Sequence, residues 1–419
     1  MPSSKDYIEM DLEYCAHNYH PIPVVISHAE GVWMYDPEGK KYLDCLSAYS
    51  SQNAGHCHPE IIATLKEQAS IVTLTSRAFH NNMMGPFLKM LAEVVGPHIN
   101  DPTNSGIMSL PMNTGTEAVS TGLKVARAWG YIKKKIPKNE AKIIVCRDNF
   151  HGRTITIVGL SSDISAARYY GNFGPYTPGF FIIPYGEPEE LEKMILEIGP
   201  SKVAAFLVEP IQGEAGVKVP PEGYLKKVRE ICTKYNILLI LDEIQTGFCR
   251  TGEFFACDHE DVKPDMLLLG KALGGGVYPV SACVTTKEII GPDVIKPGTH
   301  GSTFGGNPLA AAIGMKSIEI HLKENLAERA RNMGDYFMKR LKEIAEKRTK
   351  LPIKEVRGKG LLIAIEFEGD ARKIVEELKE NGILAKDTHS TTIRFAPPLV
   401  ITKDEIDWAI EIIEKVLIT

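Results

Sequence analysis

The chain has 419 residues, of which 44% are hydrophobic and 24% charged, ordinary values for a globular protein of two or three domains. The formal net charge is -5 and there is no basic tract, which argues against nucleic-acid and anionic-membrane binding. No apolar run reaches the ~18 residues of a membrane span, and the acidic start lacks the apolar core of a signal peptide. The eight cysteines form no CxxC pair. We therefore expect a cytoplasmic protein with reduced thiols.

The first predicted elements are a hairpin and a helix with a polar start. Residues 31–46 alternate in character around a Pro-Glu-Gly turn, a pattern typical of two paired strands. Residues 111–131 begin as an apolar run, break at Asn-Thr-Gly-Thr and continue as a helix. The free backbone N–H groups of such a helix start can bind phosphate, but Thr-Gly-Thr-Glu is also good chemistry for an ordinary helix cap.

Short apolar runs in the middle of the chain predict a buried parallel sheet. They alternate with longer helix-like stretches and lie at residues 141–146, 203–210, 237–243, 265–271 and 281–286. Runs that are apolar throughout are typical of strands buried on both faces. We therefore expect an α/β fold with a mostly parallel central sheet and helices on both faces.

The two ends of the chain differ from this pattern. After about residue 311 the sequence is strongly helical, with a strand at 360–367 and an amphipathic helix at 404–417. We expect these elements and the N-terminal hairpin to form a smaller α+β domain. The predicted division is a large domain of residues 58–310 and a small domain made of residues 1–57 and 311–419.

Three of the predicted strands end in a charged residue: Glu209, Asp242 and Lys271. Ligands of open α/β sheets bind beyond the carboxyl ends of the strands. A single charge after a strand is usually just the first loop residue, but three such charges favour one shared site.

Lys271 stands before a glycine-rich stretch, LGGG. A lysine that is buried or flanked by cations has a lowered pKa, so its neutral amine can attack a carbonyl, and the glycines let the backbone approach a bulky ring. Taken alone, Lys271 is more typical of a solvated lysine at a strand end.

Asp242, 29 positions before Lys271, strengthens the case for a site. A carboxylate beneath the ring nitrogen of pyridoxal phosphate keeps that nitrogen protonated, and the ring then accepts electrons from the reacting carbon. A metal site at Asp242 and Glu243 is the alternative, but no His pair with ligand spacing lies nearby. We read His56 and His58, which flank Cys57, as local packing.

Longer motifs identify a family. The chain resembles the class III, or ornithine-type, pyridoxal-phosphate aminotransferases of fold-type I over nearly its whole length. The motifs that carry the resemblance are HGRT (151–154), EPIQGEAG (209–216), DEIQTGFCRTG (242–252), LLLGKALGGG (267–276), HGSTFGGNP (300–308) and VRGKGLL (356–362). The spacing from DEIQ to GK is the most specific of these features.

The resemblance implies cofactor roles for individual residues. Lys271 would carry pyridoxal phosphate as a Schiff base and shuttle the proton of the reaction, and Asp242 would face the ring nitrogen. Thr303 would reach the cofactor phosphate of a neighbouring subunit, which implies a homodimer with shared sites. We expect no metal in these sites. The remaining cofactor contacts would be Gly115 and Thr116 at the phosphate, Phe150 and Ile244 against the ring, and Gln245 at its phenolic oxygen.

Several stretches resemble the ornithine branch of the family more narrowly, among them CAHNYHPIPV (15–24) and IRFAPPLVI (393–401). The expected reaction moves the terminal amine of ornithine to 2-oxoglutarate. Arg153 and Arg394 would clamp substrate carboxylates, because the guanidinium fork pairs bidentately with carboxylate. Glu214 would pair with Arg394 when ornithine is bound, Tyr19 would hold the polar end of ornithine, and Tyr49 would shape the pocket.

One residue departs from the ornithine pattern. His151 stands where animal ornithine aminotransferases carry tryptophan, and histidine is more typical of the acetylornithine and 4-aminobutyrate branches. Acetylornithine, lysine and 4-aminobutyrate therefore remain alternative amine donors. Racemases and aminomutases share the scaffold, and a cofactor-binding sensor without catalysis is the alternative outside the enzymes.

Overall fold

The computed structural model describes residues 2–162 and 171–418. Within that part of the chain the largest sheet has seven strands, in the order β4-β10-β9-β8-β7-β5-β6. Their bounds, in that order, are Ile107–Met112, Ser281–Thr286, Met266–Leu269, Leu238–Asp242, Val203–Val208, Lys142–Cys146 and Phe180–Ile183. Strands β9, β8, β7, β5 and β6 are parallel to their neighbours in this series, so the expected mostly parallel sheet is confirmed.

The prediction that residues 281–286 form a parallel strand is wrong. This strand, β10, runs antiparallel to both β9 and β4. The connection from β9 to β10 contains only the 3-10 turn η5 (Lys271–Gly274). A parallel return needs a crossover of a dozen or more residues, usually a helix, and this connection is too short to supply one.

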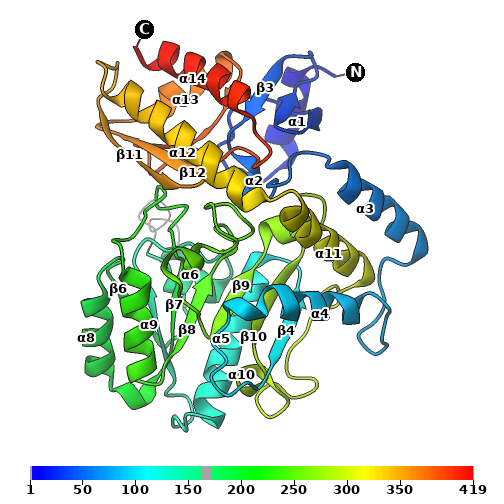
Figure 1. Ribbon diagram of the computed structural model, residues 1–419, viewed down its shortest axis with the longest axis vertical. Coiled ribbons are helices and arrows are strands. Elements are labelled where there is room, and N and C mark those ends of the chain that lie inside the picture. The colour runs from blue at the N-terminus through cyan, green and yellow to red at the C-terminus, as the bar shows by residue number, and fades with distance from the viewer. Residues whose placement is uncertain (1, 163–170, 419) are drawn as a thin grey trace.

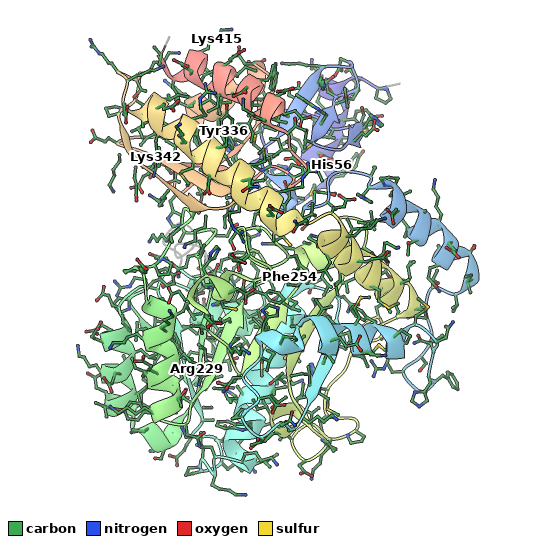
Figure 2. All side chains as sticks on the ribbon, viewed as in Figure 1. His56, Arg229, Phe254, Tyr336, Lys342 and Lys415 are labelled. Atoms are coloured by element: carbon green, nitrogen blue, oxygen red, sulfur yellow. The ribbon has the colours of Figure 1, made fainter. Side chains whose placement is uncertain are left out.

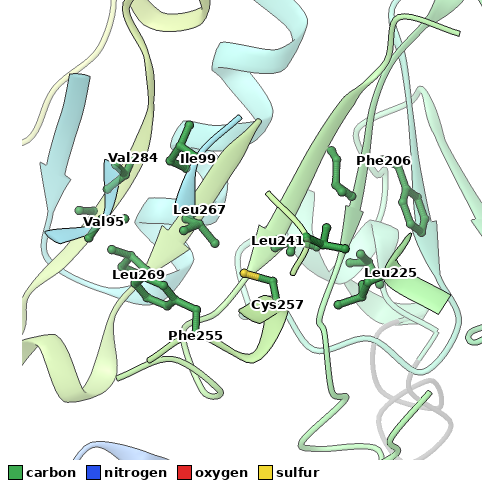
Figure 3. Packing of buried hydrophobic residues seen from close by; sticks show 14 of the residues in the cluster. Val95, Ile99, Phe206, Leu225, Leu241, Phe255, Cys257, Leu267, Leu269 and Val284 are labelled. Atoms are coloured by element: carbon green, nitrogen blue, oxygen red, sulfur yellow. The ribbon is translucent and has the colours of Figure 1, made fainter. Parts of the chain in front are cut away.

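The sheet is apolar on both faces because both are covered. In β8, Leu239 and Leu241 belong to one hydrophobic cluster, whereas Leu238 and Ile240 belong to another on the opposite face. Alternate residues of a strand point to opposite faces, so a strand between two helical layers must be apolar throughout. Figure 3 shows Leu241 in the first cluster together with Phe206.

Helices from most of the chain surround this sheet (Figure 1). They are α4 (Met84–Val94), α5 (Gly115–Ile132), α6 (Ile155–Leu160), α8 (Pro188–Ile198), α9 (Tyr224–Lys234), α10 (Lys287–Ile290) and α11 (Pro308–Lys323). Helix α3 (Pro59–Ile71) lies to the side of the sheet and packs against α11. Short 3-10 turns occur at Gly96–His98 (η1), Gly171–Phe173 (η2), Pro200–Lys202 (η3) and Ala256–Glu260 (η4). None of the described helices is both long and apolar enough to cross a membrane.

A second sheet joins the two ends of the chain. It contains β1 (His28–Glu30), β2 (Trp33–Tyr35), β3 (Lys41–Asp44) and β13 (Ile383–Leu384), in that order. The predicted hairpin is confirmed, with Trp33 opposite Leu43 in the β2–β3 pair. Strand β3 then pairs in parallel with β13, which places Leu43 beside Ile383. Figure 1 shows the blue N-terminal and the orange to red C-terminal segments together at one end of the molecule.

A third sheet and four helices complete this end. The sheet order is β11 (Ile353–Lys359), β12 (Leu362–Phe367), β15 (Thr392–Phe395) and β14 (Lys386–Thr388), and the helices are α1 (Ser4–Tyr14), α12 (Leu326–Ala345), α13 (Arg372–Glu380) and α14 (Lys403–Ile418). Tyr336 of α12 (Figure 2) and Arg340 both donate to Asp407 of α14. One core extends here from Val32 to Leu417. This shared core supports the two-domain division, which we retain as a proposal.

An unusual left-handed turn follows β3. Residues Ser47–Ser50 (α2) all have positive φ, from 45° to 70°, and none is glycine. Left-handed conformation costs roughly 1–2 kcal/mol per residue, so the surroundings must hold the turn. Buried Asp44 accepts the backbone N–H groups of Leu46 and Ser47, each at 2.8 Å, and the Ser47 hydroxyl donates to Ala396 O at 2.7 Å. The turn places Tyr49 at the site described next.

Candidate active site

A cavity of about 190 Å³ lies at the carboxyl edge of the parallel strands. Its lining consists of Gly115, Thr116, Phe150, His151, Gly152, Glu209, Ile211, Asp242, Ile244, Gln245, Thr246 and Lys271. The three charged residues at the carboxyl ends of strands β7, β8 and β9 are therefore brought together, as the sequence predicts. Of the cofactor residues expected from the sequence, all but Thr303 are in this lining.

Lys271 begins η5, directly after the extended Gly270. Its φ of 47° is in the left-handed region, a strained conformation for a residue with a side chain, and such conformations are frequent at functional sites. Burial, helped by the charge of Arg394, lowers the pKa of Lys271 to about 8 against the opposing charges of Glu214, Asp242 and Glu209. An appreciable fraction of Lys271 is therefore a neutral amine near neutral pH, the form that attacks carbonyls and accepts protons.

Asp242, the last residue of β8, is nearly buried and makes two hydrogen bonds. Its Oδ1 accepts the Ile244 N–H at 3.1 Å, and its Oδ2 accepts from His151 Nδ1 at 2.7 Å. The His151 side chain has no exposed surface. Burial lowers the pKa of His151, but the hydrogen bond to Asp242 and the charges of Asp242 and Glu209 outweigh it, so the pKa is raised. A cationic imidazolium is thus favoured against the Asp242 carboxylate.

Glu209 is a further acid of this cavity. Burial raises its pKa to about 7, although the charge of His151 acts in the opposite direction. Glu209 Oε1 accepts the backbone N–H of Phe150 at 2.9 Å, which fixes the start of the segment that also carries His151. Besides Lys271, the cavity therefore contains three side chains that can act as an acid or a base: Asp242, His151 and Glu209.

The start of α5 fits a phosphate group. Thr114 and Glu117 form a capping box there, so the ordinary helix cap that the sequence also allowed is present. However, Thr116 Oγ1 is buried and has no hydrogen-bond partner among the described residues. A Cβ at Gly152 would lie 2.3 Å from that oxygen, so the glycine keeps this corner open. An anion at the helix N-terminus would satisfy the Thr116 hydroxyl and the free backbone N–H groups.

Arg394 and Glu214 form an ion pair beside the cavity. Arg394 Nη1 lies 2.8 Å from Glu214 Oε1 and 3.2 Å from Gln245 Oε1, and Gln245 Nε2 donates to Glu214 at 3.2 Å. The Arg394 guanidinium also lies over the Tyr49 ring, 4.8 Å from its centroid. Burial alone would raise the pKa of Glu214, but Arg394 and Lys271 lower it to about 2. Glu214 is therefore a carboxylate that neutralises Arg394.

Arg153 occupies the exposed side of the site. Its Nη1 donates to Tyr19 Oη at 2.8 Å, and its guanidinium lies 5.4 Å from the centroid of the Phe150 ring. Tyr19 is 63% exposed, so this pair faces the entrance rather than the interior. The structure thus places the substrate residues expected from the sequence in two neighbouring pairs. Arg153 and Tyr19 form the exposed pair, and Arg394 and Tyr49 form the inner pair, next to Glu214.

Thr303 lies elsewhere in the subunit. It borders a larger cavity of about 780 Å³, whose lining includes residues 74–77 and 300–303. Gly115 and Lys271 also border a neighbouring cavity of about 370 Å³.

The sequence missed some of the residues that complete the cavity. Glu209 was recognisable as a strand-end charge but carried no assigned role, and His151 was noted only as a departure from the ornithine pattern. Ile211 and Thr246 gave no signal beyond their position next to motif residues. His56 (Figure 2) and His58 contact different carboxylates, Asp44 and Glu324, each at 2.8 Å.

The lining fits pyridoxal phosphate. Thr116 and the α5 start suit its phosphate, Asp242 suits its ring nitrogen, and the Lys271 amine suits its aldehyde. The fit rests on the unpartnered Thr116 hydroxyl and on a lysine and a carboxylate that reach one cavity from adjacent strands.

Comparisons with known proteins show which proteins this chain is similar to. The family model described as aminotransferase class-III matches residues 14–417. The ornithine aminotransferase of Brevibacillus brevis is 54% identical, covering 100% of this chain and 99% of that protein, and that of Bacillus subtilis is 51% identical, covering 100% and 98%. The crystal structure of ornithine aminotransferase from Toxoplasma gondii has a TM-score of 0.93 at 46% identity, covering 99% of this chain and 95% of that one. Acetylornithine aminotransferase from Elizabethkingia anophelis has a TM-score of 0.87 at 47% identity, covering 100% and 99%.

Proposed function

Because the chain belongs to the class III aminotransferases, which depend on pyridoxal phosphate, we propose that it is an ornithine δ-aminotransferase. It would move the terminal amine of L-ornithine to 2-oxoglutarate and yield glutamate 5-semialdehyde, which cyclises to pyrroline carboxylate, and glutamate. Identity above 50% over the full length of proteins named ornithine aminotransferase supports the proposal. The structural observation that carries it is the Glu214–Arg394 ion pair beside the cavity of Lys271.

The chain's own residues would share the chemistry as follows. Pyridoxal phosphate, when bound, supplies a ring that withdraws electrons from the substrate carbon bonded to the transferred nitrogen. Lys271 would remove the proton from that carbon and return one to the cofactor's C4′ atom as general base and acid. Asp242 would hold a proton at the ring nitrogen. Thr116 and Gly115 would bind the phosphate, with Phe150 and Ile244 against the ring and Gln245 at its phenolic oxygen.

Both half-reactions of this ping-pong scheme must use one pocket. Arg153 would bind the α-carboxylate of ornithine and, in the second half-reaction, the distal carboxylate of 2-oxoglutarate. Arg394 would bind the α-carboxylate of 2-oxoglutarate or glutamate. Since Glu214 already pairs with Arg394 at 2.8 Å, Arg394 is neutralised when no dicarboxylate is present, and ornithine meets no unpaired buried charge.

The proposal is tested with a panel of amines. Purified yellow enzyme is mixed with ornithine, acetylornithine, lysine or 4-aminobutyrate, and the loss of cofactor colour is followed. Ornithine is expected to react fastest. The second candidate is acetylornithine, because the Elizabethkingia anophelis acetylornithine enzyme is 47% identical. Faster reaction of acetylornithine than of ornithine would replace the proposal by that candidate.

Neutralising Glu214 is expected to separate the two half-reactions. In Glu214→Gln, Arg394 loses its carboxylate partner and becomes permanently available to a dicarboxylate. The ornithine half-reaction should therefore slow by roughly a hundred-fold or more, because leaving a buried charge unpaired costs about 3–5 kcal/mol, whereas the glutamate half-reaction is spared or accelerated. Pre-steady-state rates are measured separately with each amino acid.

Glu222→Gln is the matched control, because Glu222 is exposed and borders a different cavity. It should change neither half-reaction. Equal losses with ornithine and glutamate in Glu214→Gln would mean that Glu214 has only a structural role.

We also propose a homodimer with shared active sites. Large apolar side chains are exposed near the 780 Å³ cavity: Ile71 is 67%, Phe79 70% and Phe304 48% exposed. Exposed apolar side chains gathered in one region are typical of protein interfaces. A two-fold interface there would bring Thr303 of one subunit to the open side of the partner's cofactor cavity.

Mixed subunits test the shared site. Thr303→Ala is expected to weaken cofactor affinity, and Lys271→Ala to abolish turnover. Refolded mixtures of the two variants should regain activity, because one of the two sites in each mixed dimer would contain both wild-type residues. If the mixture stays no more active than its components, or if light scattering gives a mass near 46.3 kDa, shared sites are excluded.

A further inference from the structure

A buried histidine stands behind the proposed cofactor carboxylate. His151 Nδ1 lies 2.7 Å from Asp242 Oδ2, and the other carboxylate oxygen accepts the Ile244 N–H at 3.1 Å. The His151 side chain is fully buried, and its Nε2 has no hydrogen-bond partner among the described residues. Among the described residues, the imidazole therefore makes one hydrogen bond, to the Asp242 carboxylate.

The surroundings favour a cationic donor in this contact. The other acid near His151 is Glu209, which borders the same cavity and whose negative charge also raises the pKa of the imidazole. Hydrogen bonds from an ionised donor to a carboxylate are roughly twice as strong as neutral ones. Two donors from different directions also remove the freedom of the Asp242 carboxylate to rotate about its last bond.

We propose that His151 is a positioning residue that fixes the Asp242 carboxylate in one orientation, toward the ring nitrogen of pyridoxal phosphate. This inference rests on the proposed role of Asp242. It also gives the histidine a place in the site, because the side chain that His151 contacts is the proposed partner of the ring nitrogen, Asp242. Its effect is exerted on the cofactor rather than on the choice of amine.

The test compares two cofactors that differ only at the atom in question. Pyridoxal phosphate has the ring nitrogen, whereas 1-deazapyridoxal phosphate has a carbon there and keeps the aldehyde and the phosphate. Dissociation constants of both are measured by fluorescence quenching with apoenzyme of wild type, His151→Leu and His151→Asn. Asparagine can place an amide N–H near the position of Nδ1, whereas leucine has no donor.

His321→Leu is the matched control. His321 is also buried, donates from Nδ1 to Ser317 O at 2.7 Å, and has an Nε2 without a described partner, but it belongs to α11 and is outside the cofactor cavity. Thermal unfolding of each variant shows that it is folded before binding is measured. Any general loss of packing would appear in both histidine-to-leucine variants.

The expected result is selective for the ring nitrogen. His151→Leu should bind pyridoxal phosphate about ten-fold more weakly or worse, the size of one charge-assisted hydrogen bond, and the deaza analogue with unchanged affinity. His151→Asn should recover part of the loss, and His321→Leu should show none. Equal weakening of both cofactors by His151→Leu would overturn the inference. If wild-type enzyme itself does not distinguish the two cofactors, the role of Asp242 fails first, and the inference fails with it.

Discussion

Replacing Lys271 with alanine is expected to lower turnover by roughly 10⁴-fold or more, the upper part of the range for loss of a general acid–base group. Lys271 is the lysine of the cavity, and burial brings its pKa to about 8. Without its amine, no group at that position takes the proton from the substrate carbon. The variant should still bind pyridoxal phosphate, because Thr116 and Asp242 remain.

Two measurements check this prediction. Borohydride reduction of wild-type enzyme, followed by peptide mapping, should label Lys271, and single-turnover rates are compared for wild type and Lys271→Ala. Lys134→Ala is the control, because burial also lowers the pKa of Lys134 to about 8, but its amine donates to Val203 O and Tyr235 O away from the cavity. A pyridoxyl label on a different lysine would exclude the assignment.

Asp242→Asn is expected to slow the proton-removal step by roughly three orders of magnitude, or about 4 kcal/mol in activation free energy. The substitution keeps the shape and lets His151 donate to the amide oxygen. It removes the negative charge that holds a proton at the ring nitrogen, so the ring withdraws electrons less strongly. Cofactor affinity should fall as well.

Rapid mixing with ornithine measures the step directly. Asp265→Asn provides a control at the other end of the same sheet, where Asp265 pairs with Arg229 at 2.7 Å. That variant should lose stability without a comparable loss of rate per folded molecule. Single-turnover rates near the wild-type value in Asp242→Asn would contradict the assigned role.

The sequence predicts the site best where a simple physical rule applies. Strands covered on both faces must be apolar, so β7, β8 and β9 stand out as runs, and the charged residue that ends or follows each run is at the carboxyl edge. Glu209, Asp242 and Lys271 could therefore be placed in one cavity before their geometry was known. The substrate residues depended on family resemblance, because nothing local distinguishes Arg153 or Arg394 from other arginines.

The features that escaped prediction depend on distant contacts. The direction of β10 is decided by the length of the connection from β9 to β10. The apolar pattern of residues 281–286 holds no information about that length. The left-handed turn at Ser47–Ser50 has no glycine, so it carries no local signal, and it is held by Asp44 and by Ala396, far along the chain. The pairing of His151 with Asp242 joins residues 91 positions apart.

The parallel pairing of β3 with β13 also sets an order of events during synthesis. The backbone N–H groups of Leu43 and Cys45 donate to Gly382 and Leu384, each at 2.8 Å, and these acceptors are translated some 340 residues later. At roughly 5–20 residues per second, β13 is synthesised tens of seconds after the N-terminal hairpin with which it pairs. Meanwhile the seven strands of the main sheet, all encoded between residues 107 and 286, emerge together. One strand edge of the N-terminal hairpin therefore stays unpaired while the main sheet assembles, and the sheet that joins the two ends of the chain is completed later.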